Sequence, residues 1–142
     1  MISKIYNEND NRPTLLEDEF KQIGIDFDGV IHACTKGYHD GTIYDDPVPG
    51  SYSALEILYK KYEIVIYSAK ARSDRPLVNG KTGIQLIWEW LEKHDMKQFV
   101  KDVTAEKPRA IFYIDDRAIR FFDWNSCLKE VNYESLKIKE RI

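Results

Sequence analysis

Aspartate pairs stand at two places in the chain where an apolar run ends. Asp26 and Asp28 close the run "QIGIDF", and Asp115 and Asp116 follow the run "AIFYI". Such runs are typical of buried strands, and in an open parallel sheet ligands bind beyond the carboxyl ends of the strands. Four carboxylates gathered in one crevice raise each other's pKa unless a cation joins them. Because Mg²⁺ prefers carboxylate, water and phosphate oxygens, we expect a Mg²⁺ site here.

Two further polar residues complete a set that suits phosphoryl transfer. Ser68 ends the apolar run "IVIYS", and Lys107 lies just before the last run in "EKPRAIFYI". A hydroxyl and an ammonium group can hold phosphate oxygens, while a carboxylate can act as the nucleophile and form an aspartyl-phosphate. A second carboxyl group two residues later can protonate the leaving oxygen and then activate water. The six residues therefore predict chemistry on a phosphate ester.

Strands and helices alternate in the sequence that must position these residues. Four short apolar runs predict strands at residues 22–27, 63–68, 98–103 and 110–114, the last being the stronger of the final two. Apolar residues at spacings of three and four predict two helices between them, and the tail from Ser126 is predicted to be helical. This alternation indicates an α/β fold with a mostly parallel sheet and helices on both faces.

Each of the two internal helices has a predicted buried face and a predicted start. The buried faces comprise Leu55, Leu58, Tyr59 and Tyr62 in the first helix, and Ile84, Ile87, Trp88 and Leu91 in the second. A capping box, in which two residues three apart bond each other's backbone, is predicted at the start of each helix. The pairs are Ser53 with Glu56 and Thr82 with Gln85.

Turn-forming residues mark the segments between these elements. Residues 33–50 are rich in glycine and proline and are predicted to be loop, with room for a small hairpin around "HDG". Residues 69–81 are basic and irregular. Residues 1–21 are polar, and the sequence leaves open whether they form an N-terminal arm or a peripheral hairpin. Residues 22–142 are expected to form one domain that holds the site.

Four motifs resemble those of the haloacid dehalogenase (HAD) superfamily. They are "DFDGV" at 26–30, Ser68 closing "IVIYS", Lys107 ahead of an apolar strand, and "IDDRA" at 114–118. They occur in the family's order and cover roughly residues 22–122. The resemblance implies a three-layer Rossmann-like fold and a phosphoric monoester hydrolase that depends on Mg²⁺. The segments where family members carry large caps are short here, so we expect no large cap domain.

The resemblance also implies a role for each motif residue. Asp26 matches the nucleophile, whose carboxylate also binds Mg²⁺. Asp28 matches the general acid/base, and its backbone carbonyl reaches the metal. Ser68 matches the hydroxyl that orients the phosphate, and Lys107 matches the cation that neutralises nucleophile and phosphate.

The last motif supplies the remaining metal ligands, and the first departs slightly from the family pattern. Asp116 looks like the main metal ligand, with Asp115 as a second ligand or a partner of Lys107. Many hydrolytic family members have threonine where this chain has Val30. The presence of Asp28 favours phosphate-ester hydrolysis over dehalogenation.

Substrate contacts are expected from two loops. Family members place a helical turn and a hairpin flap after the first motif, consistent with residues 30–46, and His32 is expected to line this flap. Ala69, Lys70 and Arg72 directly follow Ser68 and are expected to bind substrate. The basic segment "KARSDR" favours a nucleotide or a nucleic-acid end slightly over a neutral sugar. A sugar phosphate or a phosphoprotein also remains open.

Two other chemistries would depend on the histidines and cysteines of the chain. His32, Cys34 and His39 suggest zinc, but no second cluster supplies a clean fourth ligand. A cysteine phosphatase needs an arginine six residues after its cysteine, and Asp40 and Tyr133 stand at those positions. Neither chemistry is therefore predicted.

Two other classes of protein also compete with the phosphatase. A phosphorelay receiver domain has its acidic pair early and Lys-Pro last, whereas here Lys107-Pro108 precedes the pair at 115–116. The remaining alternative is a phosphate-binding or regulatory protein that keeps the pocket without turnover. The intact pair of Asp26 and Asp28 speaks against it.

Composition indicates an ordinary globular chain. Of its 142 residues, 43% are hydrophobic and 32% are charged, which excludes the disordered and fibrous classes. The net charge of -3 argues weakly against broad nucleic-acid binding. The sequence shows no signal-peptide pattern and no apolar run that could cross a bilayer, and its 2 cysteines form no disulfide framework. We therefore expect a cytoplasmic protein without a membrane partner, and no oligomeric state is predicted.

Overall fold

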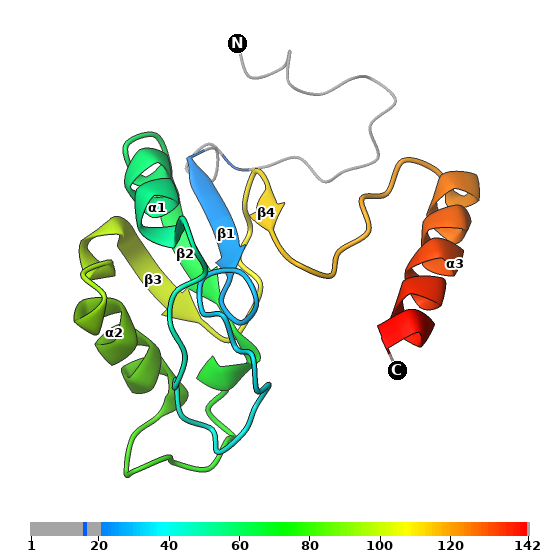
Figure 1. The fold of residues 1–142 in the computed structure, drawn as a ribbon. Coiled ribbons are helices and arrows are strands. Elements are labelled where there is room, and N and C mark those ends of the chain that lie inside the picture. Colours follow the sequence, from blue (N-terminus) through cyan, green and yellow to red (C-terminus); the bar gives the residue numbers. More distant parts are fainter. Residues whose placement is uncertain (1–15, 17–20, 142) are drawn as a thin grey trace.

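The computed structural model describes residue 16 and residues 21–141 (Figure 1). Four parallel strands form one sheet in the order β3-β2-β1-β4, with bounds β1 (Gln22–Asp26), β2 (Glu63–Tyr67), β3 (Val100–Thr104) and β4 (Tyr113–Ile114). The other elements are α1 (Ser51–Tyr59), α2 (Gly83–Lys93), α3 (Trp124–Arg141) and the 3₁₀ turns η3 (Ala69–Ala71) and η4 (Lys97–Phe99). The expected α/β class and parallel sheet are confirmed. The arm or hairpin expected over residues 1–21 lies almost wholly outside the described residues.

β1 and β2 form the centre of the sheet because their residues are apolar on both faces. Residues 23–25 and 64–67 are all buried. The two strands pair in register from Gln22 opposite Glu63 to Asp26 opposite Tyr67. β1 has β2 on one side and β4 on the other, so the order of the strands reverses across β1. In an open parallel sheet a crevice forms at this reversal, beyond the carboxyl ends of the strands.

α1 and α2 cover the same face of the sheet. Right-handed crossovers from β1 to β2 and from β2 to β3 run in the same direction, which places both connecting helices on one side. The buried cluster agrees, since it joins alternate residues of β1 and β2 to the inner faces of both helices. Its members include Ile23, Ile25, Ile64, Ile66, Leu55, Ile87 and Leu91.

α1 starts earlier than the sequence pattern suggests. Gly50 has a φ of 89°, a left-handed conformation that glycine adopts without a Cβ clash, and the helix begins directly after it at Ser51. The capping box expected from Ser53 and Glu56 is therefore wrong, because both residues lie inside the helix. Tyr59, expected in the buried face, is 48% exposed.

α2 begins as predicted. The Thr82 hydroxyl accepts the backbone N–H of Gln85, and the Gln85 side chain accepts the backbone N–H of Thr82. This capping box is confirmed. Ile87 and Leu91 are buried as expected, and Trp90, which the pattern did not single out, is buried beside them.

Two strands differ in length from the sequence expectation. The run at 110–114 is the stronger β pattern, yet β4 comprises only Tyr113 and Ile114. The weaker run at 98–103 begins as the turn η4 and continues as the longer strand β3. The hairpin around "HDG" is not formed, and residues 35–40 are turns.

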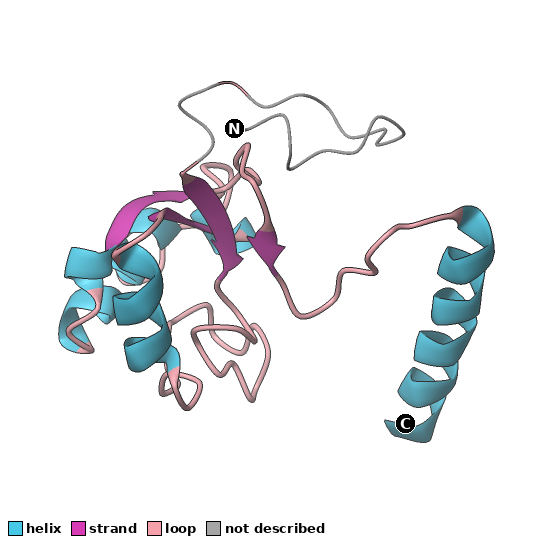
Figure 2. Ribbon diagram, turned by 90° about the horizontal axis from the view of Figure 1, so that it is seen from above, coloured by secondary structure: helices cyan, strands magenta, loops and turns pink. Residues whose placement is uncertain are grey.

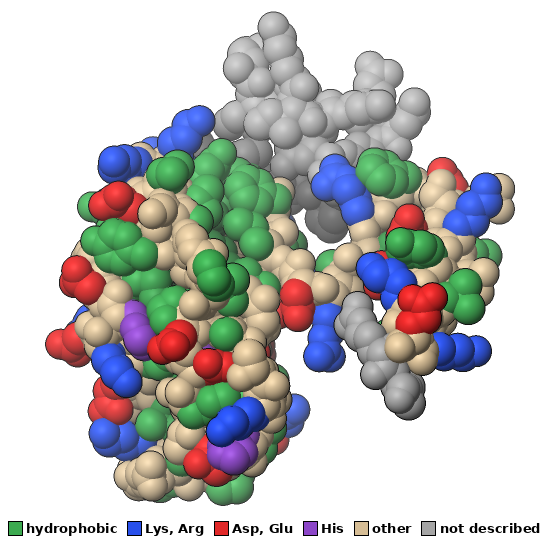
Figure 3. Space-filling view, in the orientation of Figure 1, with side chains coloured by type: hydrophobic (Ala, Val, Ile, Leu, Met, Phe, Trp, Pro, Cys, Tyr) green, Lys and Arg blue, Asp and Glu red, His purple; other side chains and the backbone are tan. Residues whose placement is uncertain are grey.

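α3 stands apart from the sheet in both ribbon views (Figures 1 and 2). The helices expected on the second face are thus not seen in the described part of the chain, and the third layer stays a prediction. Acidic and basic side chains are interspersed over the face drawn in Figure 3. Over the described residues, no helix combines the length and the apolar character needed to cross a membrane.

Candidate active site

Three of the predicted acidic residues meet at the carboxyl ends of β1 and β4. These strands are parallel neighbours, with Ile25 opposite Ile114, so the next residues, Asp26 and Asp115, leave the sheet side by side. Carboxylate oxygens of Asp26, Asp115 and Asp116 all lie within 4.8 Å of one another. We call these three residues the acidic cluster. The structure thus brings together residues about 90 positions apart in the chain, at the reversal of strand order.

The electrostatics of the acidic cluster favour a bound cation. Burial, and then the charges of Asp115, Asp116 and Asp28, together raise the pKa of Asp26 to about 6, against a hydrogen bond from the Phe27 N–H that lowers it. The neighbouring carboxylates therefore make it harder for Asp26 to ionise. A divalent cation removes this repulsion, and oxygen ligands of this kind are those that Mg²⁺ takes.

Asp115 is held as an ionised group by its own partners. The backbone N–H of Arg117 donates to Oδ1 at 2.7 Å, and the Tyr67 hydroxyl donates to Oδ2 at 2.9 Å. The Arg117 hydrogen bond, then the Tyr67 bond and the charge of Lys107, lower the pKa of Asp115 despite its partial burial. Burial of Tyr67 and its hydrogen bond to Asp115 raise the pKa of the Tyr67 hydroxyl, so Tyr67 remains a hydrogen-bond donor.

Gly29 gives Asp116 the space that it needs. Gly29 has a φ of 85°, and a Cβ at this position would lie 2.6 Å from Oδ2 of Asp116. No other residue type combines this backbone conformation with so close an approach at low strain. The glycine of "DFDGV" therefore positions a carboxylate from the other end of the domain.

Asp28 belongs to a second group of side chains. Its Oδ1 accepts a hydrogen bond from Nζ of Lys70 at 3.0 Å and one from Nδ1 of His32 at 2.8 Å. Burial alone would raise the pKa of Asp28, but these two bonds outweigh it and hold the pKa below its ordinary value. The Asp28 side chain is not a member of the acidic cluster, and its expected metal contact through the backbone carbonyl stays a prediction.

Lys70 and His32 have almost no exposed surface in this structure. Lys70 is 6% exposed and His32 has no exposed surface. The second ring nitrogen of His32, Nε2, accepts the backbone N–H of Asp45 at 3.1 Å, so the ring proton lies on Nδ1 and points to Asp28. Both residues were expected to bind substrate. In the structure both side chains hold Asp28, and their contact with substrate stays a prediction.

Ser68 and Lys107 lie near the site without touching Asp26. Oγ of Ser68 accepts the backbone N–H of Lys70 at 3.1 Å and so starts η3. Nζ of Lys107 lies 4.2 Å from the centre of the Tyr113 ring and 5.8 Å from that of Tyr67. Lys107 acts electrostatically on Asp115. Its expected contact with the nucleophile is not formed.

The basic segment after Ser68 offers less free charge than its sequence suggests. Ala69 is exposed, but Arg72 is bound by Asp74, with Nη2 to Oδ2 at 2.6 Å. Arg75 stacks over the Tyr38 ring at 5.1 Å. The guanidinium groups of this segment are thus engaged locally, which weakens the reason for preferring nucleic acid on their account.

A second set of potential ligands surrounds Asp28. Asp28, His32 and Cys34 each place one ligand atom within 4.8 Å of the others. The Lys70 ammonium already occupies Oδ1 of Asp28, and both nitrogens of His32 have partners. A cation therefore gains little here, and the zinc chemistry set aside for the sequence gains no support.

Three features of the site were not predicted from the sequence: Tyr67, Gly29 and the pairing of Lys70 with Asp28. Tyr67 precedes Ser68 at the end of "IVIY", where a hydroxyl-bearing aromatic in an aliphatic run is itself a signal. The glycine after an Asp-x-Asp pair is a second signal. No sequence feature indicated that Lys70 is buried.

Comparisons with known proteins leave the site to be judged on its own geometry. A scan against protein-family models found no match, and searches of curated proteins and of solved structures found none either.

Proposed function

We propose that this protein is a Mg²⁺-dependent phosphoric monoester hydrolase of the HAD type. The observation that carries the proposal is the acidic cluster of Asp26, Asp115 and Asp116 at the reversal of strand order. Its support from the sequence is the order of the four motifs that resemble those of the family. The third layer of the fold and the absence of a large cap belong to the same proposal.

The residues present fit Mg²⁺. Asp26, Asp115 and Asp116 would hold the ion, because three hard oxygen donors converge there and their charges raise the pKa of Asp26 when no cation is bound. When bound, Mg²⁺ supplies positive charge that offsets the carboxylates and the phosphate oxygens. The nucleophile and the acid/base are proposed to be side chains of the protein itself.

Asp26 is the proposed nucleophile. Its Oδ1 is fixed by the Phe27 N–H at 2.8 Å, which orients the carboxylate at the end of β1. A carboxylate oxygen forms a bond to phosphorus while the bond from phosphorus to the ester oxygen breaks, and the leaving oxygen takes a proton from Asp28. Water then attacks the aspartyl-phosphate and gives a proton to Asp28, which releases phosphate and restores the Asp26 carboxylate.

Lys70 and His32 orient Asp28 for these two proton transfers. As a carboxylate with a lowered pKa, Asp28 suits the second step, in which it accepts a proton from water. The first step needs Asp28 in its protonated form. The negative charge of a substrate phosphate at Asp26 would oppose the effect of the Lys70 charge and raise the pKa of Asp28 toward that form.

The proposal is tested by phosphate release from p-nitrophenyl phosphate. Wild-type protein with Mg²⁺ should turn over, and Asp26→Asn and chelation of the metal should each reduce kcat by at least about 10³-fold, since either removes a reacting group. Asp95→Asn is the matched control, because Asp95 is an exposed acid beyond the end of α2. It should retain wild-type activity.

The same assay separates catalysis from binding alone. Equal phosphate release by the wild type and Asp26→Asn would defeat the enzymatic proposal. Calorimetric binding of phosphate by a protein without turnover would then support the alternative of a phosphate-binding or regulatory protein.

A further inference from the structure

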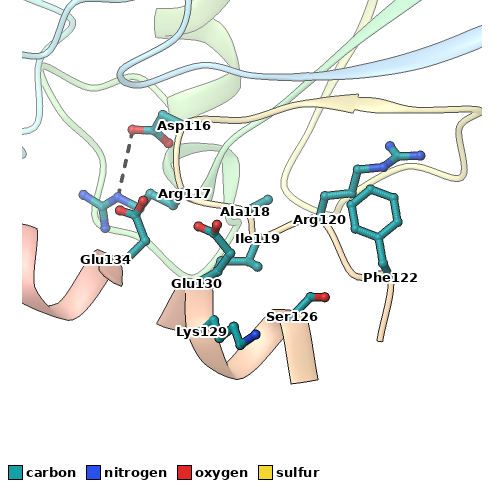
Figure 4. Close-up of a pocket in the computed structure, with 10 residues that line it drawn as sticks. All are labelled: Asp116, Arg117, Ala118, Ile119, Arg120, Phe122, Ser126, Lys129, Glu130 and Glu134. Carbon is teal, nitrogen blue, oxygen red and sulfur yellow. Dashed lines mark ion pairs between the residues drawn. The ribbon is translucent and has the colours of Figure 1, made fainter. Parts of the chain in front are cut away.

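A cavity adjoins the acidic cluster on the side of α3. It has a volume of about 550 Å³ and lies between residues 116–122, which follow β4, and residues 126–134 of α3 (Figure 4). Asp116 lines this cavity and is also a member of the acidic cluster. The volume falls within the range of pockets that bind small molecules. A group attached to a phosphate at Asp26 therefore has a place to lie.

The lining of the cavity is polar and carries both signs of charge. Arg117 lies beside Asp116, with Nε 4.0 Å from Oδ2, and Figure 4 shows its guanidinium turned toward that carboxylate. Lys129, Glu130 and Glu134 face the cavity from α3. A purely apolar ligand is disfavoured here, since it would bury these charges without partners. Hydroxyl and amino groups match the glutamates, and anionic groups match the cations.

The far end of the cavity carries an aromatic platform. The Arg120 guanidinium lies 5.3 Å from the centre of the Phe122 ring, and Phe122 is 70% exposed, so one face of the ring remains open. Phe121 and Trp124 stack edge-on against each other at 5.2 Å and are 51% and 70% exposed, but they do not line the cavity. An exposed aromatic ring backed by an arginine is the kind of surface on which nucleobases stack.

We propose that this cavity binds the nucleoside part of a nucleoside phosphomonoester, with the base stacked on Phe122. The proposal rests on the proposed function, because it places the phosphate at Asp26 and the leaving nucleoside beyond Asp116. Glu130 and Glu134 accept hydrogen bonds from sugar hydroxyl or base amino groups, and Arg120 backs the stacked ring. A free nucleotide and the phosphorylated end of an oligonucleotide share this chemistry.

A sugar phosphate leaves the aromatic platform without a role. Aliphatic hydroxyl groups satisfy the glutamates equally well, but they do not cover the open face of Phe122. The base is therefore the part of the ligand that the cavity recognises in addition to the phosphate.

Calorimetric binding to the Asp26→Asn protein with Mg²⁺ tests the inference without turnover. Adenosine monophosphate should bind roughly 5- to 100-fold more tightly than ribose phosphate, the range that base stacking on an aromatic side chain gives. Phe122→Ala in the same background should remove this preference. An oligonucleotide with a terminal phosphate is the third ligand, and whichever nucleoside ligand binds more tightly identifies the source.

Tyr133→Ala is the matched control. Tyr133 is 58% exposed on α3 and also carries a cation over its ring, Lys137 at 5.2 Å, but it does not line the cavity. It should leave the preference for adenosine monophosphate intact. Equal affinity for the two small ligands, or equal effects of Phe122→Ala and Tyr133→Ala, would overturn the inference. So would a change in oligomeric mass on Phe122→Ala without a change in nucleotide affinity, because the platform would then be an interface.

Wild-type kinetics distinguish this inference from the function on which it rests. Phe122→Ala should raise KM for adenosine monophosphate far more than it raises KM for ribose phosphate. An active enzyme with an unaltered KM would refute the nucleoside site alone. Absence of turnover with a base-dependent affinity would refute the hydrolase and leave the nucleoside site standing.

Discussion

Asp26 and Asp28 are separated by one residue but have opposite electrostatic surroundings. Burial and neighbouring acids raise the pKa of Asp26, while Lys70 and His32 outweigh burial at Asp28 and lower its pKa. Pairs of carboxyl groups whose environments separate their pKa values are a recurring basis for dividing catalytic roles. The division here agrees with Asp26 bonded to phosphorus and Asp28 exchanging protons.

The raised pKa of Asp26 predicts a pH-dependent effect of Asp26→Asn on stability in the absence of metal. The pKa is about 6 in the folded protein against an ordinary value of 3.8, so the folded state binds this proton more tightly than the unfolded chain does. The resulting stabilisation is complete below about pH 4 and is lost as the pH rises through 6. Asn cannot ionise, so the variant escapes this loss.

Thermal unfolding with a chelator present measures the effect. At pH 8 Asp26→Asn should exceed the wild type by on the order of 1 kcal/mol, or roughly 3 °C in Tm, and the difference should vanish near pH 4. A gain that is constant over this range would contradict the predicted titration. Added Mg²⁺ should reverse the order at pH 8, because it stabilises only the ionised cluster.

Gly29→Ala should damage the metal site more than the fold. An added Cβ meets Asp116 at 2.6 Å and also bears the strain of a φ of 85°. We expect a loss of roughly 1–2 kcal/mol in the free energy of unfolding and at least a 10-fold loss in Mg²⁺ affinity. Calorimetric titration with Mg²⁺ and urea denaturation measure the two effects.

Gly37→Ala is the control for the backbone strain. Gly37 also has a positive φ, of 63°, but a Cβ there meets nothing within 4 Å. It should lose a similar amount of stability and keep its Mg²⁺ affinity. Comparable losses of affinity in both variants would show that strain alone disturbs the site.

At the residue scale, the sequence predicted the acids better than the residues that hold them. Strand ends in a parallel sheet converge, so Asp26, Asp115 and Asp116 could be placed together from their spacing and order. The burial of Lys70 and His32 depends on how η3 and residues 33–50 fold against α2. That packing is long-range and leaves no periodic pattern in the sequence.

At the element scale, a glycine allows α2 and η3 to pack closely against each other. A Cβ at Gly83, the first residue of α2, would lie 1.6 Å from the backbone oxygen of Lys70. Gly83→Ala should therefore lower the free energy of unfolding by about 2 kcal/mol or more, although alanine is the better helix former. Shifting η3 also moves Lys70 away from Asp28, so activity should fall with stability.

Urea denaturation and the phosphatase assay check this prediction together. Glu92→Ala, an exposed change in the same helix, should alter both by little. A stabilised Gly83→Ala protein would show that propensity outweighs the contact between α2 and η3.

Element types were predicted more reliably than their ends. Period-two and period-3.6 patterns depend only on burial, and they located β1, β2 and α2 correctly. The start of α1 was missed because Gly50 in a left-handed conformation begins the helix without a side-chain cap. β4 is short although its run is apolar, since only Tyr113 and Ile114 pair with β1.

At the scale of the whole molecule, α3 carries an apolar stripe that the sheet does not cover. Trp124, Leu128, Val131 and Ile138 lie on one side of the helix and are all at least 44% exposed. Leu128→Gln should therefore change the free energy of unfolding by less than about 0.5 kcal/mol. Leu55→Ala, which empties a site that is 2% exposed, should lose about 2–5 kcal/mol.

Denaturation of the two variants checks whether α3 is independent of the core. A loss of several kcal/mol for Leu128→Gln would mean that the stripe packs in solution. That result would restore the expected third layer, since a helix over the second sheet face is what the alternation of strands and helices predicts.

His32 connects residues 33–50 to Asp28, the proposed general acid and base. Its imidazole is fully buried. Nδ1 donates a hydrogen bond to Asp28, and Nε2 accepts the backbone N–H of Asp45. A displacement of this loop at Asp45 would break the hydrogen bond to Nε2 of His32 and so disturb the contact of His32 with the Asp28 carboxylate. The position of this loop is therefore coupled to the orientation of Asp28, the proposed general acid and base.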